Sequence, residues 1–160
     1  MNGPRPAAGR RALTCPRPDP ALRAAFLATL YGPPGERVRL SPVPSPAPVD
    51  WAAGSWAIVT AWNPDAQQAP ESANRAAQER LLACVLQAGL TPRPAVNGSG
   101  EWAEESLLVP GASLAQARSW GEAFGQKAVL FGVGSRAALV WLPGPTERCW
   151  AAPVSEHFGN

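Results

Sequence analysis

The segment SWAIVTAW at residues 55–62 constrains the fold most, because both of its faces are apolar. On an extended strand Trp56, Ile58 and Trp62 lie on one face, and smaller aliphatic residues alternate with them on the other. A strand that is apolar on both faces lies inside a sheet and needs a covering layer on each side. We therefore expect residues 55–62 to form a central strand, which the following Asn-Pro-Asp turn ends.

Two helices and further strands follow this segment. Apolar spacing predicts a helix over 72–87, closed by Gly89, and a second over 114–125, opened by a capping box of Ser113 and Gln116. The remaining strands are expected at 92–96, 104–111, 128–134 and 136–143. The order strand, helix, strand, strand, helix, strand predicts an α+β fold with a ferredoxin-like split βαβ (βαββαβ) sheet, an extra C-terminal strand and an N-terminal helix.

The composition divides the chain into a leader, one domain and a tail. Most of the 19 prolines lie in its first third, and residues 1–18 lack periodicity, so we predict a disordered leader rich in proline and arginine. Residues 19–143 are expected to form a single α+β domain, with an amphipathic helix over 19–31 and a stiff proline linker at 41–48. Residues 144–160 show no clear pattern and are interpreted as a tail.

The predicted topology gathers polar residues at one end of the sheet. The first predicted strand ends there, and the third begins there. The two core helices share one face of the sheet, and each has one of its ends at this same end of the sheet. The helix over 19–31 is expected to cover part of the opposite face. Amide, carboxylate and hydroxyl groups at this end would bind a small polar molecule through directional hydrogen bonds. The predicted ligand-binding residues are Trp62, Asn63, Asn74, Trp102, Glu105, Ser106 and Gln126.

The motifs around this cluster resemble a known family. TAWNP at 60–64, Asn74, WAEES at 102–106 and FGQKAV at 124–129 occur in the order typical of DUF3293, a bacterial domain of unknown function. The resemblance covers roughly residues 20–142 and leaves the leader and the tail outside. It implies a bacterial protein and supplies no reaction.

Other interpretations stay open beside a ligand-binding module. The cluster is structural if Asn63 only starts a turn and Gln126 only ties a loop to a strand edge. In an enzyme, Glu105 would be the general acid or base, assisted by Ser106, with its pKa raised by burial between the tryptophans. A protein-interaction domain could use the proline-rich segments. A nucleic-acid-binding domain is disfavoured, because the net charge is only +2 and no basic residues interleave the tryptophans.

Several chemistries are excluded by composition. A single histidine, His157, and scattered carboxylates give no metal-ligand spacing, and no cofactor motif occurs, so we expect neither a metal nor a cofactor. The widely spaced Cys15, Cys84 and Cys149 favour reduced thiols. Without a secretory signal or a run of about 18 apolar residues, the chain is predicted to be cytoplasmic and to lack a membrane span. Its oligomeric state is not predicted.

Overall fold

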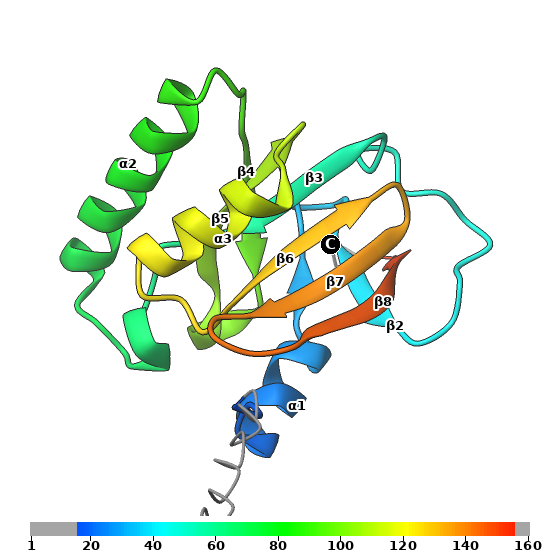
Figure 1. Cartoon of the computed structure of the whole chain (residues 1–160), viewed down its shortest axis with the longest axis horizontal. Helices are drawn as coiled ribbons and strands as arrows, with labels where there is room; N and C mark the ends of the chain where they lie inside the picture. The colour runs from blue at the N-terminus through cyan, green and yellow to red at the C-terminus, as the bar shows by residue number, and fades with distance from the viewer. Residues whose placement is uncertain (1–15, 156–160) are drawn as a thin grey trace, which may run out of the picture.

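Eight strands and three α-helices make up the computed structural model, which describes residues 16–155 (Figure 1). The helices are α1 (Pro20–Ala28), α2 (Glu71–Gln87) and α3 (Leu114–Ala123). The strands are β1 (Leu30–Tyr31), β2 (Val38–Ser41), β3 (Ser55–Val59), β4 (Arg93–Asn97), β5 (Glu104–Pro110), β6 (Ala128–Val133), β7 (Arg136–Trp141) and β8 (Thr146–Pro153). Two short 3-10 turns lie in the connections, η1 (Pro64–Ala66) and η2 (Gly100–Trp102).

Most of the predicted leader lies outside the described residues, as do Cys15 and His157. Within the described part, no helix is long and apolar enough to cross a membrane.

The strands form one antiparallel sheet that curls into a barrel-like shape. Their spatial order is β1-β2-β8-β7-β6-β3-β5-β4, and every neighbouring pair is antiparallel. The two edges approach each other, because the Gly98 N–H donates to the Leu30 carbonyl at 2.9 Å and the Val96 N–H donates to the Gly32 carbonyl at 3.0 Å. The sheet is therefore nearly closed, which leaves little exposed edge.

The predicted ferredoxin-like fold class is wrong. The order strand, helix, strand, strand, helix, strand does occur from β3 to β6, but these four strands are only half of the barrel-like sheet. The other half includes β1, β2 and β8, which the predicted sheet did not contain. Strand β8 lies within residues 144–160, interpreted from the sequence as a tail, and it pairs with both β2 and β7.

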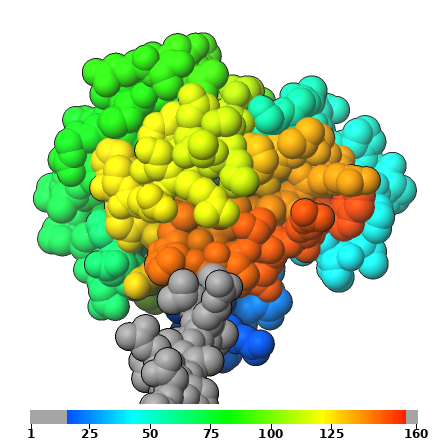
Figure 2. Space-filling model, viewed as in Figure 1, coloured from blue at the N-terminus to red at the C-terminus, as the bar shows by residue number. Residues whose placement is uncertain are grey.

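Both faces of β3 are covered, as its sequence requires, but by different means. Ala57 and Val59 pack against α2 and α3, which lie together on the outer surface (Figure 2). Trp56 and Ile58 point into the barrel, where the curled sheet itself covers them. The first helix is shorter than predicted, because the chain leaves it at Thr29 and pairs with β2. It therefore covers only one end of the barrel interior.

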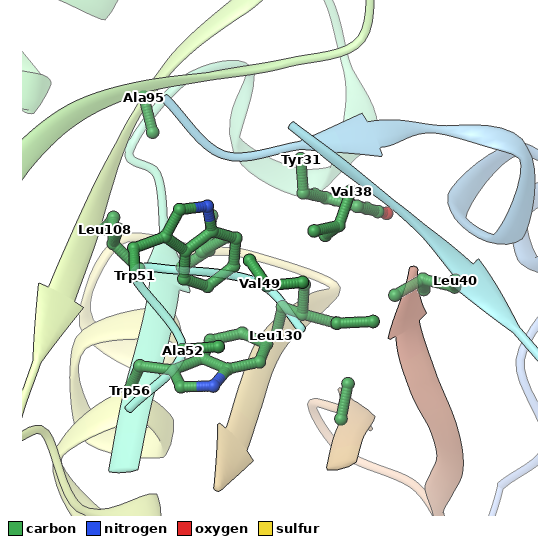
Figure 3. Packing of buried hydrophobic residues seen from close by; sticks show 13 residues of the cluster. Tyr31, Val38, Leu40, Val49, Trp51, Ala52, Trp56, Ala95, Leu108 and Leu130 are labelled. Atoms are coloured by element: carbon green, nitrogen blue, oxygen red, sulfur yellow. The ribbon is translucent and has the colours of Figure 1, made fainter. Parts of the chain in front are cut away.

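Two tryptophans fill the interior at the end opposite α1 (Figure 3). The ring of Trp51 meets that of Trp56 nearly at a right angle, with centroids 5.0 Å apart. Their indole N–H groups donate to the carbonyls of Glu36 at 2.8 Å and of Gly134 at 2.9 Å. On the strand beside Trp56, a Cβ at Gly132 would lie 2.2 Å from the indole ring, so only glycine leaves room for it.

Candidate functional site

The end of β3 leads into a strained loop that is held by a pair of asparagines. Asn63, Asp65 and Ala66 have φ values of 48°, 58° and 57°, a left-handed conformation that costs free energy in residues other than glycine. Asn74 on α2 holds this loop, because its Oδ1 accepts from the Asn63 N–H at 2.9 Å. Its Nδ2 donates to the Asn63 Oδ1 at 2.9 Å and to the Ala69 carbonyl at 3.3 Å. Asn74 is buried, so this predicted ligand-binding residue contacts protein.

The segment that joins α3 to β6 fixes the loop from its other side. The Gln126 Nε2 donates to the Trp62 carbonyl at 3.0 Å, and the Asp65 N–H donates to the Gly125 carbonyl at 2.8 Å. Gly125 has a φ of 66°, and a Cβ there would lie 3.2 Å from Pro64. These contacts agree with the structural interpretation of Gln126, which ties a loop to a strand.

The carboxylate that meets this loop belongs to Glu104. The Asn63 Nδ2 donates to the Glu104 Oε1 at 3.0 Å. Alternation along β5 directs neighbouring side chains to opposite faces, so Glu104 is half-buried and Glu105 lies on the outer face. There the Glu105 Oε1 lies 3.6 Å from the Arg75 Nη1, and both side chains are at least half exposed. The structure thus separates Glu105 from the rest of the predicted cluster.

Glu104 lines a cavity of about 280 Å³ at the α1 end of the barrel. Its aromatic walls are Phe26, Tyr31, Trp62 and Trp102. The predicted residues that reach this cavity are Trp62, Asn63, Trp102 and Gln126. The others do not line it: Asn74 lies behind the loop, Glu105 faces outward, and Ser106 is buried on β5.

The surroundings of Glu104 disfavour its charge. Burial raises the pKa of its carboxyl above the usual range, and the hydrogen bond from Asn63 opposes this only in part. Within residues 16–155 no cation pairs with Glu104, and no donor reaches its Oε2. Lys127, the single lysine of the sequence, lines the cavity wall, but its ammonium lies 3.8 Å from the Asp65 carboxylate. The carboxylate therefore keeps an unused acceptor in a partly apolar site.

Two further polar atoms of the cavity residues lack partners. The Trp62 Nε1 and the Asn97 Oδ1 are buried, and neither makes a hydrogen bond within the described part of the chain. Buried polar atoms without partners are uncommon and call for an explanation. In the same part of the chain, no group of three or more His, Cys, Asp or Glu side chains could hold a metal ion.

Sequence reasoning missed Glu104, Asn97 and Tyr31 as cavity residues. Alternation places Glu104 on the same face of β5 as Leu108, but only the structure shows that this face lines the barrel interior. The other two lie on strands that meet only through the curling of the sheet. No spacing along the sequence indicates that contact.

Replacing Glu104 by glutamine is expected to raise the melting temperature at neutral pH. Glutamine keeps an Oε1 acceptor for Asn63 and removes a charge that the site disfavours. Because the folded-state pKa is raised, stability of the parent chain falls as pH rises from the ordinary carboxyl pKa through the raised one. The gain should therefore be largest above the raised pKa and vanish in acid. Thermal unfolding of Glu104→Gln at several pH values measures this gain in melting temperature, and Glu105→Gln is the exposed control. A gain that grows as pH falls would contradict the prediction.

The central part of the chain matches a protein-family model. A family model described as a protein of unknown function, DUF3293, matches residues 59–129. The match contains all four motifs but is narrower than the span expected from the resemblance. Searches of curated proteins and of solved structures gave no match. Residues 59–129 therefore match the DUF3293 family, as the motifs predicted.

Proposed function

We propose that this chain binds a small polar molecule in the cavity lined by Glu104. The observation that carries the proposal is a half-buried carboxylate with one oxygen held by Asn63 and the other without a partner in residues 16–155. Moving a carboxylate out of water costs free energy, because it loses its hydrogen bonds to water. An oxygen without a new hydrogen-bond donor does not offset this cost. A ligand that donates a hydrogen bond to Oε2 would offset this cost.

The position and size of the cavity favour a small ligand. Mouths of barrels are frequent ligand sites, and pockets for drug-sized molecules measure about 300–1,000 Å³. At about 280 Å³ this cavity lies just below that range. The paired asparagines fix the loop that carries Trp62 and Asn63, so binding requires little ordering of the wall.

The alternative of an enzyme using Glu105 has no support in the geometry. Glu105 does not line the cavity, and its side chain is about half exposed beside Arg75. Its proposed assistant Ser106 is buried, with a hydroxyl that has no partner among the described residues. We therefore base the proposed function on Glu104.

Blocking the cavity from α1 tests the proposal. Ala25 is exposed and lines the cavity, so we expect Ala25→Trp to fill its mouth without disturbing the core. Ala24→Trp places the same side chain on the same helix away from the cavity and is the matched control. In a thermal-shift screen of small metabolites, a ligand of this cavity should raise the melting temperature of the parent chain and of the control. The shift should be absent in Ala25→Trp.

Two results would contradict the proposed site. One is a compound that stabilises all three proteins equally, which would place its binding elsewhere. The other is a screen in which no compound gives a shift sensitive to Ala25→Trp.

A further inference from the structure

We infer that the ligand of this cavity is a small organic cation, whose charged N–H group pairs with Glu104 while its apolar body lies against the aromatic wall. This inference rests on the proposed function and adds the chemical class of the ligand. It comes from a carboxylate that has no ion pair within the described residues and from four aromatic side chains that line the same cavity.

The charge of the site selects a cation over a neutral donor. Within residues 16–155 the only hydrogen bond to the carboxylate comes from the neutral amide of Asn63, and no cation pairs with it, so its negative charge has no counter-charge there. In a partly buried site an ionic hydrogen bond is about twice as strong as a neutral one. A cationic N–H group at Oε2 would neutralise Glu104, whereas an anion would meet repulsion.

The aromatic walls favour the same class of ligand. Trp62, Trp102, Tyr31 and Phe26 all line the cavity, and ring faces attract cations through their quadrupoles. Trp102 is 67% exposed, which leaves its ring available at the mouth. The phenol of Tyr31 donates to the Phe26 carbonyl at 2.6 Å, and burial raises its pKa, so it adds no charge.

Lys127 does not oppose a cation at Glu104. Its side chain lines the cavity, but its ammonium lies 3.8 Å from the Asp65 Oδ1, and the lysine side chain is 44% exposed. A lysine commonly packs its aliphatic stem along an apolar wall while the charge stays in water. Lys127 thus contributes mainly its stem to the wall.

Three probes of one shape and different charge test the inference. Benzamidine, benzamide and benzoate share a phenyl ring and carry a cationic, a neutral and an anionic group. At about pH 8, where carboxylates are ionised, we expect benzamidine to bind at least tenfold more tightly than benzamide, and benzoate not to bind. Isothermal titration gives the affinities, and the indole N–H signals of Trp62 and Trp102 in NMR spectra place the probe.

Variants at neighbouring positions of β5 provide the charge control. Glu104→Gln keeps the acceptor for Asn63, so it should fold, weaken benzamidine at least tenfold and leave benzamide unchanged. Glu105→Gln removes the same charge from the outer face and should change neither affinity. Benzamidine should also bind more weakly as pH falls through the raised pKa of Glu104.

The possible failures are distinguishable. Equal binding of benzamidine and benzamide, with both indole signals shifted, would overturn the cation and leave the ligand site in place. Benzamidine binding that survives Glu104→Gln would also overturn it. If none of the probes moves either indole signal and the Ala25-sensitive screen is empty, both the inference and the proposed function fail.

Discussion

Replacing Trp56 by alanine is expected to lower the free energy of unfolding by about 3–5 kcal/mol, the usual range for deleting a buried aromatic side chain. Trp56 is fully buried in the barrel interior, contacts the ring of Trp51 and donates to the Gly134 carbonyl. The substitution removes all of these contacts and leaves a cavity. Denaturant unfolding measures the loss, and the melting temperature should fall by roughly 10 °C.

The same substitution at an exposed tryptophan is the control. Trp102 is 67% exposed, so Trp102→Ala should change the stability by no more than about 0.5 kcal/mol. Equal losses at Trp56 and Trp102 would mean that the barrel interior is not the main core. In that case, burial of apolar side chains in the barrel interior would not explain why the sheet curls.

Local signals predicted the elements of the fold well. The capping box of Ser113 and Gln116 begins α3, as predicted. Strand β3 lies between β5 and β6, as its two apolar faces predicted. Both core helices pack on one face of the sheet. Each of these features depends on residues close together in the sequence or on the faces of a single element.

The fold class could not be predicted because closure of the sheet depends on distant, weakly marked strands. Strand β1 has only two residues, too few for a periodic pattern. Strand β8 follows a Pro-Gly-Pro segment and carries Glu147 on its inward side, where an apolar residue would be expected. The Arg23 Nε and the Trp141 Nε1 donate to the Glu147 carboxylate at 2.7 and 2.8 Å, so the charge is accommodated by contacts that the sequence does not indicate.

The sequence points to Glu105, and the cavity is lined by Glu104, for a related reason. Residues 107 and 109 of β5 pack under the helices, whereas Leu108 points into the barrel, so both faces of the strand are apolar. Without the closed sheet, nothing in this pattern distinguishes the face of Glu104 from that of Glu105. The loop residues Asn63 and Gln126 were easier to find because they lie in short motifs.

Replacing Asn74 by aspartate is expected to cost about 3 kcal/mol or more of stability. The side chain is 3% exposed, and its Nδ2 is a donor to the Asn63 Oδ1 and to the Ala69 carbonyl. Aspartate has the same shape but places an oxygen there, so three oxygens face one another in a buried site. The left-handed loop then loses the hydrogen bond that the Asn63 Oδ1 accepts from residue 74. Denaturant unfolding of Asn74→Asp near neutral pH measures this loss.

The pH dependence of this loss separates a reversed hydrogen bond from a general disturbance of α2. The introduced carboxyl should have a raised pKa in the folded state, because burial and neighbouring oxygens disfavour its charge. Its penalty is then complete above that pKa and declines as pH falls and the protonated acid donates a hydrogen bond again. Gln87→Glu makes the same change on an exposed turn of α2 and should cost no more than about 0.5 kcal/mol. A loss in Asn74→Asp that stays constant with pH would show that the paired amides do not hold the loop of the site.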